Sequence, residues 1–346
     1  MDPLTHALAS YTMQRAVFPG LSRAATLSVV LAGTIADIDF LSSYFGPSAY
    51  LAVHHKYFHS LVAAVAFGLL ATLPFCLFRP QSSEHQISRV TIFTAAFAAA
   101  LLHLVLDLCQ SAGVELLWPF STRRFAMDWL PSFDLWVLGI LLLGILLPLL
   151  SGLVTEEIGA RRKGPRGRLG AAVAFAALIL YFAARFLYHG DAISALESRT
   201  YRGELPRKVA AFAESNSPFH WHGIVETERA LHEVEVPVGP GAEFDPASAI
   251  STYKPEPSPA LDSIRNSQVA SHFLEVARFP KATIEQTPTG FRVLLRAFPY
   301  NRDSGPGLFT LNQERRVEVV IDTDPFGKIL SEELARVPSS RDFSRR

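Results

Sequence analysis

The sequence predicts a mainly α-helical membrane protein, in which a polytopic helix bundle over residues 1–189 precedes a smaller α+β extramembrane domain over residues 190–346. Composition supports this fold class: the chain of 346 residues is 49% hydrophobic and only 18% charged, whereas soluble domains carry about 25% charged residues. The apolar excess is confined to the first part of the chain, where stretches long enough to cross a bilayer recur. The length suits about two domains.

Four segments are apolar enough to predict membrane-spanning helices, because a span needs about 20 mostly apolar residues. They are residues 60–78, 90–106, 135–154 and 169–184. The last is short, but "RFLY" can extend it, with the Arg185 side chain reaching towards the lipid headgroups. Two weaker segments, 3–18 and 24–36, are predicted to form a helical hairpin that packs against the bundle.

The loop 155–168 predicts the orientation in the membrane, because basic loops stay in the cytoplasm. Its basic residues are Arg161, Arg162, Lys163, Arg166 and Arg168. The N-terminus, the connections 41–59 and 109–133, and everything after residue 188 are then expected on the opposite side of the membrane.

Histidines and aspartates recur at the ends of the apolar segments, and the predicted orientation places them all at the non-cytoplasmic end of the bundle. Ionisable groups inside membrane segments are rare and usually functional. Imidazole and carboxylate together are typical of a metal site. The candidate ligands are His6, Asp37, Asp39, His54, His55, His59, His103, Asp107 and Asp134.

Each candidate also has a structural interpretation. His103 and Asp107 are four residues apart, hence on one helix face, and could form a buried hydrogen bond. Asp37 and Asp39 cannot both point inward from a regular helix, so we expect one to ligate while the other orients a histidine. Asp134 could cap the following helix. The joint arrangement favours a metal site.

Several short motifs carry a resemblance to a known family. They are "MDPLTHAL", "GTIADIDFL", "HHKYFHSL", "HLVLDLCQSAGVELLWPFSTRRFAMDW" and "FDLW". In order and spacing, residues 1–150 resemble the YdjM-like family of bacterial inner-membrane proteins, which are described as metal-dependent hydrolases and as LexA-binding.

The match departs from the family pattern at two places. Ala36 replaces the proline of the family's P-D-x-D motif. The family's H-R-G-x-T-H-S motif places its second histidine on His59. Counting back from there selects His54 as the first histidine, whereas a one-residue gap selects His55, so this choice stays open.

We therefore expect a membrane-bound metal-dependent hydrolase, a phosphoesterase acting on membrane lipid or a lipid-linked substrate. The mixed nitrogen and oxygen ligands suit zinc, with manganese or iron as alternatives. The candidate catalytic residues are Asp39, Arg123 and Arg124. The two arginines could hold a phosphate by bidentate contacts, or anchor the chain among aromatic residues at the membrane interface.

The alternative function is a non-catalytic membrane protein with a structural metal site that binds a regulatory protein partner.

The chain lacks a G-x-S-x-G elbow, a Walker loop and a C-x-x-C pair, which disfavours serine hydrolase, NTPase and redox functions. Its net charge of zero gives no general attraction for nucleic acid. Cys76 and Cys109 are interpreted as buried thiols that do not form a disulfide. No cleavable signal peptide is expected, since Asp2 and His6 stand where a signal peptide has its basic start and its apolar middle.

The distal part predicts strands in "FHWHGIVETERALHEVEVPV", "GFRVLLRAFPY" and "RRVEVVIDTD", and an amphipathic helix in "SQVASHFLEVARF". Residues 237–259 contain six prolines and are expected to form a loop. His220 and His222 alternate along a predicted strand, and we interpret them as surface or packing residues.

Overall fold

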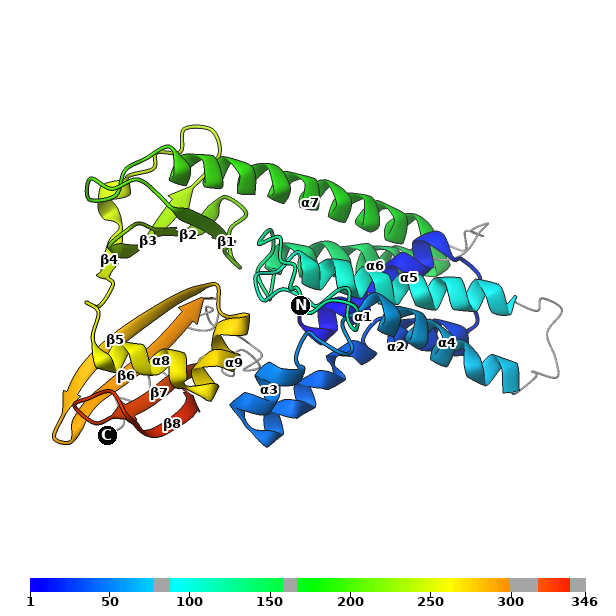
Figure 1. Ribbon diagram of the computed structural model, residues 1–346. Helices are drawn as coiled ribbons and strands as arrows, with labels where there is room; N and C mark the ends of the chain where they lie inside the picture. The colour runs from blue at the N-terminus through cyan, green and yellow to red at the C-terminus, as the bar shows by residue number, and fades with distance from the viewer. Residues whose placement is uncertain (78–87, 158–166, 299–316, 337–346) are drawn as a thin grey trace. The chain divides into compact units, whose positions relative to one another are not determined.

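The computed structural model describes residues 1–77, 88–157, 167–298 and 317–336 (Figure 1). The chain divides into two compact units, each with a hydrophobic core of its own. The helical unit comprises Met1–Asp39, His55–Asp191 and Phe212–His220. The distal unit comprises Phe40–His54, Ala192–Ala211 and Trp221–Arg346.

The helical unit is built around α5, which packs against α1, α2 and α4 (Figure 1). Its elements are α1 (Pro3–Val17), α2 (Arg23–Ala32), the 3-10 segment η1 (Ile35–Phe45), α4 (Leu61–Leu77), α5 (Arg89–Leu108), α6 (Leu135–Glu157) and α7 (Arg168–Glu197), the last residues of η1 and α7 falling in the distal unit. Ala95, Ala96 and Ala99 of α5 are fully buried in the core. Their small side chains let neighbouring helices approach closely.

Polar caps fix where these helices begin. The Asp2 carboxylate accepts from the backbone N–H of Thr5 at 2.9 Å, and Pro3 occupies the first turn of α1. The Ser22 hydroxyl accepts from the N–H of Ala25 at 3.2 Å at the start of α2. Each cap satisfies a backbone donor that the helix leaves unpaired. The cap of α1 therefore sets the position of His6 in its first turns.

Within the described residues, two helices are long and apolar enough to cross a membrane: α5 with 20 residues and α7 with 30. A third candidate is the pair of α2 and η1, which bends by 48° at its break. The other two predicted spans fall on shorter apolar helices, α4 and the part of α6 from Leu135 to Leu150. A helix of 17 residues such as α4 is about 26 Å long, just short of a hydrocarbon core of about 30 Å.

The outer faces of the shorter helices are nevertheless apolar. Leu69 and Leu70 of α4 are 58% and 56% exposed, and Leu147 and Leu150 of α6 are 59% and 57% exposed. Soluble proteins rarely expose such contiguous apolar surface. These faces are suited to contact with lipid.

The expectation that Arg185 reaches towards the headgroups is wrong. Its side chain is 0% exposed, and its Nε donates to the carbonyl of Trp129 at 2.9 Å, while Nη1 donates to the carbonyl of Ser217 at 3.3 Å. α7 continues to Glu197, so Arg185 lies inside the helix and not at its end. The guanidinium joins two loops of the helical unit to α7.

The distal unit contains two four-stranded sheets, with strand orders β1-β2-β3-β4 and β5-β6-β7-β8, except that the last two residues of β1 and the first residue of β2 belong to the helical unit (Figure 1). The strands are β1 (Lys208–Ala213), β2 (His220–Glu226), β3 (Ala230–Pro237), β4 (Ile250–Tyr253), β5 (Phe279–Thr287), β6 (Gly290–Phe298), β7 (Val317–Thr323) and β8 (Ile329–Arg336). The second sheet is antiparallel throughout. Short helices α3 (Pro47–Val53), α8 (Pro259–Asn266) and α9 (Gln268–Val276) complete the unit.

The predicted strands and amphipathic helix of the distal part correspond to β2, β3, β6, β7 and α9. Phe273 of α9 packs with Val293, Val319 and Ile321 in the core that covers the second sheet. The expectation of a loop over residues 237–259 is wrong in part, because it contains β4 and the 3-10 turn η2 (Pro246–Ser248). The β4 sequence "ISTY" is rich in residues that favour strands.

The two cysteines are free thiols, but the expectation that both are buried is wrong for Cys76, which is exposed. Cys109 is buried, and burial raises the pKa of its thiol to about 12. The group therefore stays protonated and poorly reactive near neutral pH.

Candidate metal centre

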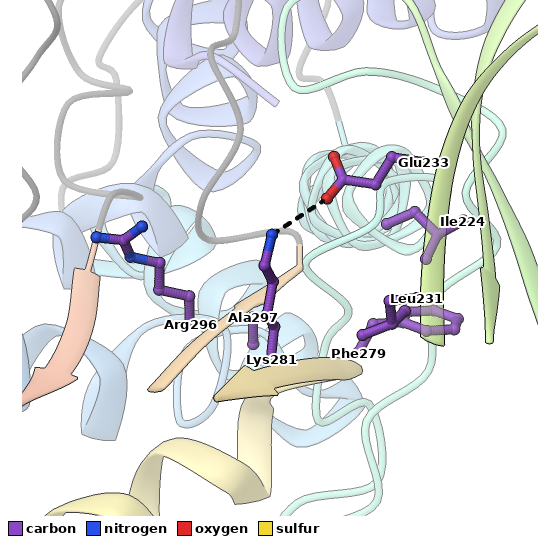
Figure 2. A pocket seen from close by; sticks show the side chains of 7 residues that line it. All are labelled: Ile224, Leu231, Glu233, Phe279, Lys281, Arg296 and Ala297. Atoms are coloured by element: carbon purple, nitrogen blue, oxygen red, sulfur yellow. Dashed lines mark ion pairs between the residues drawn. The ribbon is translucent and has the colours of Figure 1, made fainter. Parts of the chain in front are cut away.

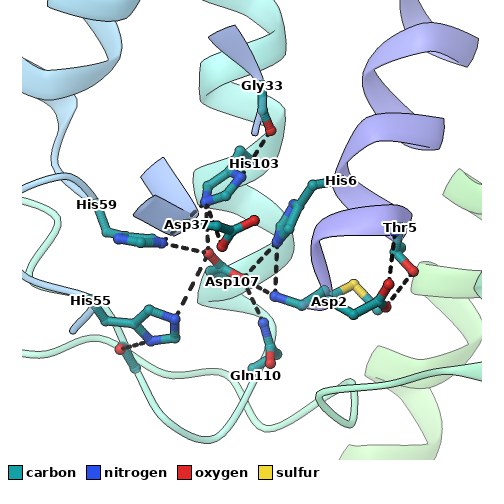
Figure 3. A network of polar contacts seen from close by, with 12 residues as sticks. Asp2, Thr5, His6, Gly33, Asp37, His55, His59, His103, Asp107 and Gln110 are labelled. Carbon is teal, nitrogen blue, oxygen red and sulfur yellow. Dashed lines mark hydrogen bonds and ion pairs between the residues drawn. The ribbon is translucent and has the colours of Figure 1, made fainter. Parts of the chain in front are cut away.

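Candidate ligands from four parts of the helical unit point towards Asp107 (Figure 3). They are His6 of α1, Asp37 of η1, His55 and His59 from the segment before α4, and His103 and Asp107 from the end of α5. The side chains of His6, His59 and Asp107 are 0% exposed. Ionisable groups buried so completely require a charge partner or a metal.

The two oxygens of the Asp107 carboxylate face different rings. Oδ2 lies 3.2 Å from Nε2 of His59 and 3.1 Å from Nε2 of His103. Oδ1 lies 3.2 Å from Nε2 of His6. The Nε2 atoms of His59 and His103 are themselves 3.1 Å apart. Four donor side chains therefore meet within ordinary ligand spacing.

Backbone carbonyls orient two of the rings. Nδ1 of His103 donates to the carbonyl of Gly33 at 2.9 Å, and Nδ1 of His55 donates to the carbonyl of Gly113 at 3.0 Å. A carbonyl only accepts, so each Nδ1 carries the proton and each Nε2 presents its lone pair to the cluster. Metal-binding histidines are usually held in this way.

Asp39 positions two histidines and lies behind them. Its Oδ2 is 3.1 Å from Nδ1 of His59 and accepts from the backbone N–H of His55 at 2.9 Å. His55 has a φ of 60°, in the left-handed region that such residues rarely adopt. The contacts from Asp39 hold this conformation, so Asp39 takes the orienting part expected of one aspartate in the "DID" motif, while Asp37 joins the ligand atoms.

The site favours positive charge at the His59 ring. Burial alone would disfavour the imidazolium, but hydrogen bonds and charge from Asp107 and Asp39 outweigh it and raise the pKa of His59 to about 10. A divalent cation beside Nε2 would satisfy the same carboxylates and displace that proton, because a ligating histidine is neutral.

Within the described part of the chain, two groups of side chains can hold a metal ion. One contains His6, Asp37, His103 and Asp107, and the other contains His55, His59 and Asp107. In each group the donor atoms lie within 4.8 Å of one another. Imidazole nitrogen with carboxylate oxygen suits a borderline divalent ion such as zinc, manganese or iron, so the donor set fits the expected cofactor.

Two neighbours of Asp107 were not anticipated from the sequence. Gln110 donates to its Oδ1 at 2.6 Å. The Met1 ammonium also contacts Oδ1 and lies 2.9 Å from Nε2 of His6. Gln110 follows Asp107 by three residues, a spacing that could have indicated it. Nothing in the sequence pattern indicates Met1.

His54 and Asp134 have other partners. The ring of His54 stacks on Tyr50, with 4.4 Å between centroids. Asp134 accepts from the N–H of Trp136 at 2.8 Å and from the hydroxyl of Tyr181 at 2.8 Å. Neither belongs to the two groups found among the described residues. Of the two histidines left open by the sequence, His54 and His55, the structure places His55 at the cluster. Asp134 caps the following helix, which was its alternative role.

The two candidate arginines lie in the segment that covers His55. Nε of Arg124 is 3.5 Å from the buried Glu115 carboxylate, and the N–H of Glu115 donates to the carbonyl of His55 at 3.0 Å. The guanidinium of Arg123 lies over the Phe125 ring, 5.3 Å from its centroid. Arg124 is thus connected to the site through Glu115, while Arg123 has the aromatic neighbour expected of an interfacial anchor.

His220 and His222 are not members of these groups. His220 is exposed, and Nε2 of His222 is 3.8 Å from the Glu233 carboxylate. Neither residue occurs in a metal-competent group within the described ranges. The structure therefore agrees with the interpretation of His220 and His222 as surface or packing residues.

A cavity of about 240 Å³ lies in the distal unit and was not anticipated (Figure 2). Its lining residues are Ile224, Leu231, Glu233, Phe279, Lys281, Arg296 and Ala297, from strands of both sheets. Each cation has an acidic neighbour: Lys281 is 4.0 Å from Glu233, and Arg296 is 2.6 Å from Glu318. Because these charges are paired, the cavity has no marked preference for an anion.

Asp39→Asn is expected to lower metal affinity by about 10–100-fold, the usual effect of losing a partner that orients a ligand. The amide keeps the shape but removes the charge beside Nδ1 of His59. Competition with a chromophoric chelator, on protein in detergent, measures the change. The matched control is Asp191→Asn, at an exposed acid of α7. Equal affinities in wild type and Asp39→Asn would show that Asp39 does not position the ligands.

Comparison with curated proteins and with solved structures gives no match. The family model described as YdjM inner membrane protein matches residues 1–192. The matched region includes the whole cluster around Asp107 and all the candidate spans except the last turns of α7. The chain belongs to the YdjM inner membrane protein family.

Proposed function

We propose that the chain is a membrane-bound, metal-dependent hydrolase, and specifically a phosphoesterase that acts on a lipid-linked or membrane-surface substrate. The observation that carries this proposal is the convergence of four buried histidines and the largely buried Asp37 on one buried carboxylate, Asp107. A structural zinc site is closed by four ligands. Six donors exceed that requirement and favour a site that does chemistry.

The residues have distinct parts in this proposal. His59, His103 and Asp107 hold the cation, with His6, His55 and Asp37 as further donors. When bound, a divalent ion such as zinc supplies Lewis acidity, which polarises a phosphoryl oxygen and activates water. Asp39 keeps the His59 and His55 donors in position. Arg123 and Arg124 supply positive charge for a substrate phosphate, with Arg124 fixed through Glu115.

The membrane location supports the substrate class. The helices α2 and α4, which carry exposed leucines, pack against the site-bearing helix α5, so a substrate held in the bilayer would meet the site by lateral diffusion. We propose four spans plus the N-terminal hairpin, with the site and the distal domain outside the cytoplasm. The basic residues of loop 155–168 support this orientation; residues 158–166 lie outside the described residues.

The burial of the donors favours a second candidate function. With His6, His59 and Asp107 at 0% exposure, the cation could be structural, and the protein could act by binding a regulatory partner. The two functions differ in a simple way. A hydrolase turns over substrate only with metal, whereas a structural site affects stability alone.

The test uses spheroplasts that contain the wild type or His103→Ala, together with the purified proteins. We expect intact wild-type spheroplasts to hydrolyse an added soluble phosphomonoester, and the purified protein to hydrolyse phosphatidate in mixed micelles. A chelator should abolish hydrolysis and zinc should restore it, while His103→Ala should stay inactive. Activity only after permeabilisation would invert the orientation. Full metal content without any hydrolysis would favour the structural function.

A further inference from the structure

Asp107 is the one residue shared by the two metal-competent groups found in the described part of the chain. We propose that its carboxylate bridges two divalent cations, so that the centre is dinuclear. This inference rests on the metal site of the proposed function and assigns its two halves. The two oxygens of Asp107 face different donors, as a bridging carboxylate requires.

The first cation position lies on the Oδ2 side. Oδ2 of Asp107, Nε2 of His59 and Nε2 of His103 form a triangle with sides of 3.1, 3.1 and 3.2 Å. Ligand atoms bound tetrahedrally at about 2.0–2.1 Å are separated by about 3.3 Å. The triangle therefore matches one face of a metal coordination shell. Nε2 of His55, 4.0 Å from Oδ2, lies at the edge of this set.

A cation also resolves an electrostatic conflict at this triangle. Nδ1 of His103 is committed to the Gly33 carbonyl, and Nδ1 of His59 faces Asp39. With His59 neutral, as a ligating histidine must be, the two Nε2 atoms direct lone pairs towards each other and towards a carboxylate oxygen, whereas a proton on the His59 ring fills the same place in the absence of a metal. Three electron-rich atoms at this spacing, buried from solvent, repel one another unless a positive charge lies among them.

The second position lies on the Oδ1 side. Nε2 of His6 is 3.2 Å from Oδ1, and the Asp37 carboxylate belongs to the same group of donors, together with His103, whose Nε2 lies 3.8 Å from Oδ1 of Asp37. His103 therefore stands between the two positions. This side already attracts positive charge, because the Met1 ammonium contacts Oδ1 and His6. In the proposed centre, His6, Asp37 and Oδ1 hold the second divalent ion.

The number of donors also favours two ions. The groups contain six residues, whereas a single zinc takes four ligands. Paired ions about 3.5–4 Å apart, linked by shared ligands, are typical of enzymes that hydrolyse phosphoesters. A dinuclear centre would thus support the phosphoester substrate of the proposed function, although peptide-bond hydrolases also use paired ions.

The experiment measures metal stoichiometry and the coupling between ions. Purified full-length protein in detergent is stripped with a chelator, reloaded with Mn²⁺, and analysed by elemental analysis and electron paramagnetic resonance. We expect two ions per chain and a spin-coupled spectrum. His6→Ala should bind one ion per chain and give an uncoupled spectrum, while His222→Ala in the distal unit should keep two. Thermal unfolding of each variant checks that it is folded.

One ion per chain at saturating Mn²⁺ in the wild type would overturn the dinuclear assignment, with the ammonium as the second positive charge. Two ions in folded His6→Ala would overturn the assignment of His6. These outcomes differ from failure of the proposed function. Two coupled ions in a protein that hydrolyses no substrate would refute the hydrolase and leave the dinuclear centre intact. One ion with hydrolysis would refute only the second position.

Discussion

Replacing Asp107 with asparagine is expected to lower affinity for divalent metal by at least about 100-fold, the upper end of effects caused by losing a mere orienting partner. The amide has nearly the same shape, but it lacks the negative charge that faces His6, His59 and His103. Because Asp107 belongs to both donor groups, the substitution weakens every position at once. Elemental analysis after purification without chelators, followed by competition titration, measures the loss.

Asp134→Asn is the matched comparison, since it changes another buried aspartate of the same unit. Asp134 bonds to Trp136 and Tyr181, so this variant should keep its metal and show a change only in stability. The reverse pattern, with metal lost in Asp134→Asn and retained in Asp107→Asn, would refute the site.

The second large effect concerns stability. Arg185→Leu is expected to lower the free energy of unfolding by about 2–4 kcal/mol, because the carbonyls of Trp129 and Ser217 lose a charged donor in a buried place. Thermal unfolding in detergent measures this change. Hydrogen exchange should also increase in residues 212–220, which Arg185 holds to α7.

Arg168→Leu provides the control on the same helix. Arg168 is exposed at the start of α7, and exposed substitutions usually change stability by no more than about 0.5 kcal/mol. If the two variants unfold alike, the buried guanidinium contributes little and its bonds to the loops are incidental.

Local sequence pattern was sufficient for most of the helical elements. Long apolar runs give the helices of residues 60–78, 90–106 and 169–184 wherever they lie in the fold, because apolar side chains must leave water. The spacing of four residues between His103 and Asp107 places them on one helix face without reference to any other segment. The motifs of residues 1–150 were likewise sufficient to indicate the family.

The lengths of the apolar helices were harder to predict from the sequence. The predicted segments 60–78 and 135–154 fall on helices that are described as shorter apolar elements. Hydrophobicity sets which residues avoid water, but the ends of a helix depend on caps and on neighbouring segments. The same reason explains β4, whose four residues pair with β3 although the surrounding prolines indicate a loop.

The sequence by itself determined which residue types would gather at the ends of the apolar helices, because composition and spacing act within one segment. Only the tertiary structure decided which of them meet. His55 enters the cluster since the Gly113 carbonyl, 58 residues away, fixes its ring, and Asp39 stands behind His59 since η1 approaches the segment before α4. Arg185 is buried because Trp129 and Ser217, far along the chain, offer it carbonyls. Such contacts depend on how separate segments pack, and packing is decided by the whole core at once.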